Sequence, residues 1–149
     1  MMCNNHPLIY KHKKVFSQAI MAYREKKNDL AIIGLLVVID GLLTDVSGNF
    51  GTNIITRAKA VIEKVEENEI ICNNDIIPMT LAITFQRTME SLSESTSFTG
   101  KEPKNLNRHW ILHGRSYRRK TKLDCIKILN FIYGILLIND YADIELNDI

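Results

Sequence analysis

A long apolar run, Leu30–Leu43, restricts the possible folds of this chain more than any other segment. Periodicity predicts a helix here, and apolar residues fall on nearly every side of it. A helix of this kind is central in a helical bundle, because only contacts all round keep its side chains from water. Its one charged residue, Asp40, then needs a cationic or hydrogen-bonding partner, since an unpaired buried carboxylate is costly.

The rest of the chain predicts further helices. Apolar residues recur at helical spacing, and no long strand-like alternation stands out. The expected helices are 8–27, 30–44, 54–69, one with Pro78 in its first turn that continues to Leu92, a short one begun by Asn105 or Asn107, and 123–139, which Thr121 and Asp124 begin as a capping-box variant. We therefore predict an all-α fold, an antiparallel bundle of about five to six helices.

The length and composition predict a single domain over residues 1–149. We expect frayed termini at 1–7 and 140–149, and a mobile loop over 93–104, where Ser, Thr, Gly and Pro are frequent. Three scattered cysteines favour a reducing cytoplasm over a disulfide framework. The N-terminus lacks the apolar stretch of a signal peptide, and the runs 30–43 and 126–138 are short for a membrane span. We therefore expect a cytoplasmic protein that does not bind a membrane.

Positive charge is concentrated in one segment. Residues 101–122 hold eight Lys or Arg and one acid, Glu102, which gives a net charge of +7. The other 127 residues carry a net charge of −5. Such a segment indicates a polyanionic partner, and RNA or another phosphate-bearing ligand is the commonest kind. The alternative interpretation is a solvated basic turn between two helices.

The stretch Asn105–Gly114, NLNRHWILHG, directly precedes most of this charge and contains the only tryptophan of the chain. In it, Arg108 and His113 are separated by four residues, and His109 follows the arginine. A histidine titrates near neutral pH and can accept or donate a proton. An arginine presents a permanently charged planar group to phosphate oxygens. Cleavage of RNA by its own 2′-hydroxyl requires these groups and no metal or cofactor.

The motif Asn107-Arg108-His109-x-x-x-His113-Gly114 resembles the R-x4–6-H signature of HEPN domains. The segment 29–43 resembles the helix that precedes such motifs, and Asp40 matches its acidic position. HEPN domains are small helical bundles, and many are metal-independent ribonucleases of toxin–antitoxin and phage-defence systems, including RNA-guided CRISPR nucleases. The resemblance implies an endoribonuclease that acts as a homodimer, with its two motifs face to face, and an antitoxin or other protein as a further partner.

On this hypothesis His113 is the general acid or base, and Arg108 stabilises the charge of the transition state. Asn107 and His109 orient the substrate, and Asp40 supports the site. The residues expected to hold flanking phosphates are Arg115, Arg118, Arg119 and Lys122. In a HEPN subgroup paired with nucleotidyltransferase antitoxins, a tyrosine lies two residues after the histidine. Arg115 stands at that place here, and Tyr117 lies two residues further on, so its modification does not follow from the resemblance.

Five positions along an α-helix separate Arg108 and His113 by about 140° around the axis. Both side chains therefore reach one cleft only if the segment begins a helix, or if two copies of the chain face each other. This geometry makes the homodimer a prediction of the catalytic hypothesis.

Three alternatives use the same residues. First, a non-catalytic helical module that binds nucleic acid or nucleotides, or docks a partner protein, would use the same basic segment. Second, both residues would have only structural roles: Arg108 would pair with Asp40 to satisfy the acid, and His113, which precedes a glycine, would cap a helix end. Third, a zinc site would use His109 and His113 with a carboxylate or Cys125, but no third ligand has a fixed spacing, so we expect no metal. His6 and His12, near the N-terminus, are expected to be exposed.

Overall fold

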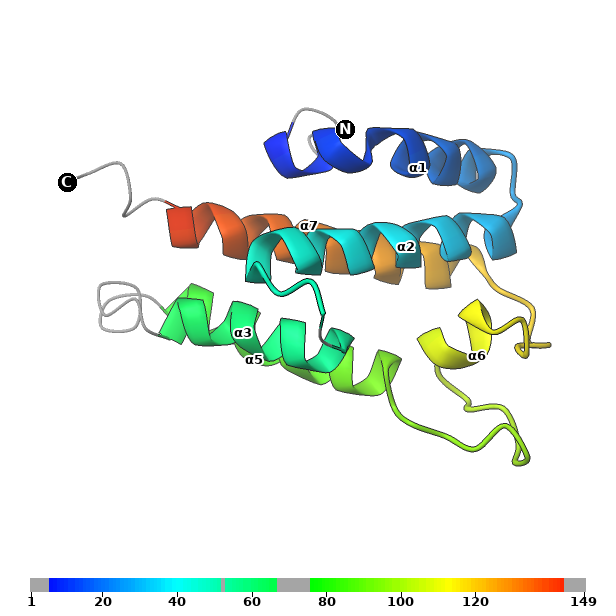
Figure 1. Ribbon diagram of the computed structural model, residues 1–149. Coiled ribbons are helices and arrows are strands. Elements are labelled where there is room, and N and C mark those ends of the chain that lie inside the picture. The colour runs from blue at the N-terminus through cyan, green and yellow to red at the C-terminus, as the bar shows by residue number, and fades with distance from the viewer. Residues whose placement is uncertain (1–5, 52, 67–75, 144–149) are drawn as a thin grey trace.

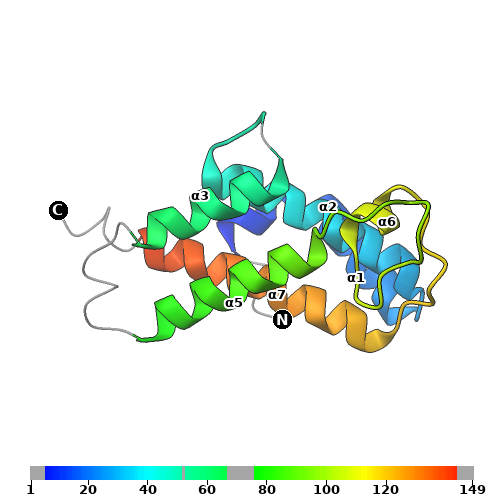
Figure 2. The same cartoon turned by 90° about the horizontal axis from the view of Figure 1, so that it is seen from below.

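The computed structural model describes residues 6–51, 53–66 and 76–143, which form helices and no strands. The helices are α1 (Pro7–Arg24), α2 (Asn28–Ser47), α3 (Ile54–Glu66), α5 (Ile76–Leu92), α6 (Arg108–Leu112) and α7 (Lys122–Asp143). The predicted all-α fold is confirmed. In Figure 1, α2 and α7 form a middle layer, α1 covers one side of it, and α3 and α5 cover the other. Figure 2 shows α6 and the loop before it at one end of the bundle.

Helix α2 is central, as its apolar composition predicts. It packs against α1, α3, α6 and α7. At 20 residues it is long and apolar enough to cross a membrane, so the expectation of a run too short for a span is wrong for this helix. However, 56% of its most apolar window is buried among the other helices. This burial is typical of the core helix of a soluble protein.

One side of α2 stays uncovered. The side chains of Leu30, Ile33 and Val37 are 60%, 40% and 46% exposed. They recur at helical spacing, and the next position along the same stripe is Asp40. The helix is therefore not buried all round, and its exposed apolar stripe leads to the candidate site.

Helix α1 packs closely on α2 and is also tied to it by polar contacts. A Cβ atom at Gly34 would lie 2.9 Å from the Cβ atom of Ala19, so the two backbones approach at a point where only glycine fits. His12 Nε2 lies 3.0 Å from Asp45 Oδ2, and His6 Nε2 lies 2.8 Å from Asp140 Oδ1 on α7. The expectation that His6 and His12 are exposed is wrong, because their side chains are only 15% and 22% exposed.

Several helix ends differ from the sequence expectation. Helix α1 stops at Arg24 because the backbone turns at Lys26, which has a φ of 61°. Helix α2 continues to Ser47 and ends at Gly48, whose φ of 70° gives a left-handed cap. Helix α7 continues through Asp143, into the segment expected to be frayed. The expected helix end at 67–69 and the turn at 73–75 lie outside the described residues.

Candidate active site

The short helix α6 is positioned by its first residue, Asn107. The Asn107 Oδ1 atom accepts a hydrogen bond from the Trp110 N–H at 3.1 Å, which confirms the predicted N-cap. Its Nδ2 donates to the Glu94 carbonyl at 2.8 Å, and the side chain is buried. Both ends of the amide are therefore occupied. Asn107 orients the helix and the preceding loop, and its buried side chain is not among the residues that line the cavity described below.

Trp110 holds α6 on the bundle. The indole is buried, and its Nε1 donates to Thr96 Oγ1 at 2.6 Å, while Ile111 beside it enters the core. These contacts leave His109 and His113 exposed, whereas Arg108 is turned toward α2 and is only 23% exposed. His113 occupies the C-cap position, before Gly114 with its φ of 65°. The backbone therefore places His113 at the helix end, as the alternative interpretation expects.

Arg108 binds the carboxylate of Asp40. The distance from Arg108 Nη2 to Asp40 Oδ1 is 3.0 Å, and Arg57 Nη2 on α3 lies 3.3 Å from the same oxygen. Arg57 Nη1 also donates to the Asp40 carbonyl at 3.1 Å and to the hydroxyl of Thr44. The predicted partner of Asp40 is confirmed, although the carboxylate is 36% exposed and not fully buried. Two arginines against one acid leave a positive charge here.

Arg57 was missed by the sequence analysis. Its position places it on the apolar face of α3, between Ile54 and Ala58, which are both buried. An arginine among buried positions requires an internal partner. That signal was present in the sequence, and it could have paired Arg57 with Asp40, the one acid in an apolar helix.

The rings of Phe98, His109 and His113 are in contact with one another at α6. The Phe98 ring stacks on His109 with a centroid distance of 4.6 Å and an interplanar angle of 7°. His113 meets His109 edge-on at 4.4 Å, and the Arg115 guanidinium lies 5.2 Å from the Phe98 centroid. Phe98 was missed by the sequence analysis, although it is the one aromatic residue of the loop 93–104. This contact, with those of Glu94 and Thr96, fastens that loop to the candidate site.

An open cavity of about 330 Å³ lies between the start of α3, the residues after α5, and α6. Its lining consists of Asn53, Ile54, Ile55, Ser93, Ser95, Arg108 and His109. Arg108 Nε and Ser93 Oγ are buried atoms without a hydrogen-bond partner among the described residues. His113 is not part of this lining. The structure brings Arg108 and His109 to one cavity, and His113 contacts the ring of His109 edge-on without lining it, so the expected pair of Arg108 and His113 does not share this cavity within one chain.

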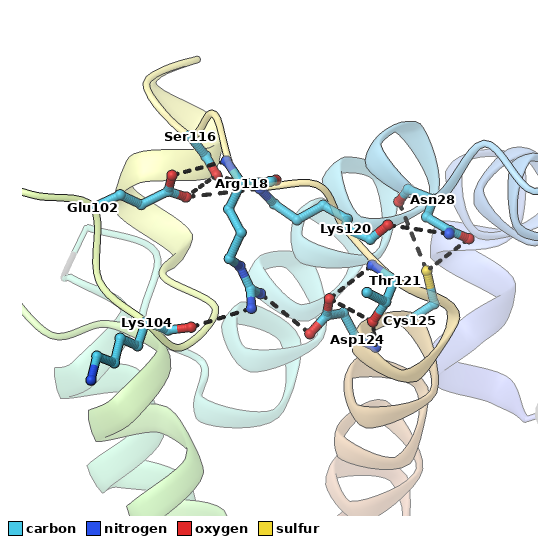
Figure 3. A network of polar contacts seen from close by, with 9 residues as sticks. All are labelled: Asn28, Glu102, Lys104, Ser116, Arg118, Lys120, Thr121, Asp124 and Cys125. Carbon is cyan, nitrogen blue, oxygen red and sulfur yellow. Dashed lines mark hydrogen bonds and ion pairs between the residues drawn. The ribbon is translucent and has the colours of Figure 1, made fainter.

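Part of the basic segment is held by a network of polar contacts within the protein, as Figure 3 shows. The Glu102 carboxylate accepts hydrogen bonds from the Ser116 hydroxyl and from the N–H groups of Tyr117 and Arg118, at 3.1 and 2.9 Å for the two N–H groups. Burial raises the pKa of Glu102, but these hydrogen bonds and the charge of Lys120 lower it more, so its pKa is below the ordinary value. Lys120 is buried, which lowers its pKa, although Glu102 opposes this effect.

Arg118 is also held inside this turn. It donates to the Lys104 carbonyl at 3.2 Å and to Asp124 Oδ1 at 3.3 Å. Asp124 accepts from the N–H of Thr121 at 2.8 Å, and the Thr121 hydroxyl accepts from the Asp124 N–H, which confirms the predicted capping box. Burial raises the pKa of Asp124, but its bonds to Thr121 and the charge of Arg118 lower it overall. Arg118 therefore supports the turn, and its expected phosphate contact has to compete with Asp124.

The remaining cations of the basic segment are exposed. They are Lys101, Lys104, Arg115, Arg119 and Lys122. Tyr117 is 77% exposed, and its hydroxyl accepts from the Glu102 N–H at 3.4 Å. Three of the four cations expected to meet phosphate thus have exposed side chains, and Arg118 is the exception.

Among the described residues, no group of three or more His, Cys, Asp or Glu side chains is placed to hold a metal ion. Comparisons of the chain with protein-family models, with curated proteins and with solved structures gave no match.

Proposed function

We propose that this chain is a metal-independent endoribonuclease of HEPN type that acts as a homodimer in the cytoplasm. The observation that carries the proposal is one open cavity lined by both Arg108 and His109, with His113 in edge contact with His109. A toxin or a phage-defence effector is the natural setting for such an enzyme, and an antitoxin is then a natural protein partner.

Cleavage of RNA by its own 2′-hydroxyl requires two proton-transfer groups and one cation. The 2′-hydroxyl of RNA attacks the neighbouring phosphorus and loses its proton to one histidine. The bond from phosphorus to the 5′-oxygen breaks, and that oxygen receives a proton from a second donor. Arg108 stabilises the charge on the crowded phosphate, because only one of its N–H groups is donated to Asp40. His109 and His113, 4.4 Å apart, are the two candidates for proton transfer.

The homodimer is supported by the exposed stripe of α2. Leu30, Ile33 and Val37 form an apolar surface that the bundle itself does not cover. The stripe leads to Asp40, where Arg108 binds, so an interface built on it borders the site in each copy. Exposed apolar patches beside a site are typical of protein contacts.

The test uses purified protein and labelled single-stranded RNA in the presence of a chelator. We expect cleavage to persist in the chelator and to leave a 2′,3′-cyclic phosphate on one product. His109→Ala and His113→Ala should each lower the cleavage rate by about 100-fold or more while RNA affinity stays within a few-fold, because general acid–base groups contribute about that much. Absence of cleavage by the wild-type chain with any RNA tested contradicts the proposal.

Arg57 supplies a matched control for Arg108. Both arginines bind the same oxygen of Asp40, but only Arg108 lines the cavity. If Arg108 serves catalysis, Arg108→Gln abolishes cleavage and Arg57→Gln reduces it far less, after correction for the folded fraction. If Arg108 only satisfies Asp40, the two variants behave alike.

The alternative function is a non-catalytic helical module that binds nucleic acid or nucleotides, or docks a protein. It is favoured by the ion pair with Asp40 and by the C-cap position of His113, which give both residues a structural use. Such a module retains RNA through its exposed cations, with an affinity that falls steeply as salt rises, and shows no cleavage in the assay above.

A further inference from the structure

A second place on the molecule has the features of a small-molecule site. It is a groove between α5 and α7, and it does not share any lining residue with the cavity at Arg108. Two adjoining cavities of about 470 and 340 Å³ make up the groove. Both are lined by Thr84, Thr88 and Lys127, so they lie side by side.

The groove is open because short side chains lie along this seam. Thr84 and Thr88 line it from α5, and Gly134 lines it from α7. A Cβ atom at Gly134 would meet nothing within 4 Å, so space is free there. Phe85 and Phe131 stack beneath, with centroids 5.0 Å apart and an interplanar angle of 9°, and both rings are buried. The groove therefore has a stacked pair of aromatic side chains as its floor.

The two ends of the groove differ in chemistry. One end is apolar and is formed by Leu81, the two phenylalanines and Gly134. At the other end lie Arg87 and the Arg118–Asp124 ion pair, and Lys127 lies where the two cavities adjoin. That ion pair is neutral as a whole, and in the described part of the chain no ion pair involves Arg87 or Lys127. Two positive charges without an ion-pair partner among the described residues thus border the groove, Arg87 at its polar end and Lys127 beside its apolar end.

The distance between these ends sets the size of a ligand. Lys127 and Gly134 are seven positions apart on α7, which is about 10 Å along a helix. The cavity volumes fall within the range usual for small-molecule sites.

We propose that the groove between α5 and α7 binds a small amphipathic organic anion. Its apolar body, a fused aromatic ring pair or a chain of about ten carbons, lies over Phe85, Phe131 and Gly134. Its carboxylate, sulfonate or phosphate head lies between Arg87 and Lys127. This site is separate from the cavity at Arg108, with which it shares no lining residue, although Arg118, one of the cations expected to meet phosphate, lies at its polar end.

The test uses two probes that share an apolar body. One is 1-anilinonaphthalene-8-sulfonate, and the other is N-phenyl-1-naphthylamine, which lacks the sulfonate. Both increase in fluorescence when bound, so titration gives a Kd for each. Wild-type protein should bind the anion more tightly than the neutral probe.

Three variants then separate the two ends. Gly134→Leu fills the apolar end of the groove. It should raise the Kd of both probes by about tenfold or more, because the added side chain occupies the space that their apolar bodies need. The double variant Arg87→Gln with Lys127→Gln should raise the Kd of the anionic probe about tenfold and leave the Kd of the neutral probe within about twofold of the wild-type value. The double variant Lys14→Gln with Lys59→Gln removes the same charge from exposed positions elsewhere and should change neither.

The proposal is overturned if the wild-type chain does not bind the anionic probe, or if Gly134→Leu, with an unchanged circular dichroism spectrum and Tm, binds both probes as the wild type does. If the arginine–lysine variant loses affinity for both probes equally, the placement of the head group is overturned. Decanoate and decyl phosphate as competitors distinguish the head groups: displacement by either supports the site and names the better head, and displacement by neither contradicts it.

Discussion

Asp40 joins three helices through one carboxylate. It lies on α2 and receives Arg57 from α3 and Arg108 from α6. A carboxylate has room for several donors, so the two arginines do not exclude each other. Removal of either arginine leaves Asp40 paired, whereas removal of Asp40 leaves two neighbouring cations, each with a buried Nε that already lacks a partner.

We therefore expect Asp40→Asn to destabilise the fold by about 1–2 kcal/mol, since the pair is partly exposed and solvent screens it. Urea unfolding followed by circular dichroism measures this. Asp29→Asn, which changes an exposed carboxylate on the same helix, is the control and should cost less. Equal losses in the two variants would mean that the arginines gain nothing from Asp40.

At this scale the sequence predicts kinds of partner better than their identity. The need of Asp40 for a cation followed from its apolar surroundings, and Arg108 was named because the motif drew attention to it. Arg57 was not named, because periodicity shows which residues share a face but not which faces meet. The cap formed by Asn107 is a local contact and was predictable, whereas its bond to the Glu94 carbonyl depends on where the loop runs.

At the scale of elements, α6 depends on its surroundings. Five residues are too few for a helix to be stable alone. The Asn107 cap, the buried Trp110 and the stacked Phe98 supply the stability that the helix lacks. The sequence predicted the helix and its cap, but the order in the loop before it arises from contacts made by single side chains.

Two helical glycines should respond in opposite ways to replacement by alanine. A Cβ atom at Gly41 would lie 2.3 Å from the ring of His12, which is held by Asp45, so Gly41→Ala should destabilise the fold by about 1–3 kcal/mol. Gly134→Ala meets open space and should stabilise it by about 0.5–1 kcal/mol, because alanine favours the helix. The Tm of each variant measures the change. A higher Tm for Gly41→Ala would refute the contact with His12.

Acid should loosen the turn built around Glu102. The pKa values of Glu102 and Asp124 are both lowered in the folded protein, so each adds stability above the ordinary carboxyl pKa of about 4. That stability is lost as the pH falls from about 5 through the lowered pKa values. Glu102→Gln should therefore lower the Tm at pH 7 and flatten its decline toward pH 3. Glu63→Gln, at an exposed position on α3, should leave the profile unchanged.

At the scale of the whole molecule, the neighbours of α2 decide what stays uncovered. It packs against α1, α3, α6 and α7, yet Leu30, Ile33 and Val37 remain exposed. The apolar composition predicted its central place correctly. It could not show the open side, because the number of neighbours depends on how the whole chain packs.

If this open side is the surface between two copies, a charge placed on it should separate them. We expect wild-type protein to be a dimer by light scattering, and Ile33→Glu to be a monomer at the same concentration. Ile83→Glu is the matched control, since Ile83 on α5 is 45% exposed against 40% for Ile33. A monomeric wild type, or a dimer that tolerates Ile33→Glu, removes this interface from the proposed mechanism.

The internal position of Glu102 also bears on how the chain meets proteases. Residues 115–122 hold five Lys or Arg. Because trypsin cleaves after these residues, the sequence alone predicts that trypsin cuts this segment first. In the folded protein, however, the backbone N–H groups of residues 117 and 118 are bound by the Glu102 carboxylate, and the side chain of Lys120 is buried. Trypsin needs an extended, accessible strand, so the native turn should resist digestion, and Glu102→Gln should turn it into the earliest point of cleavage.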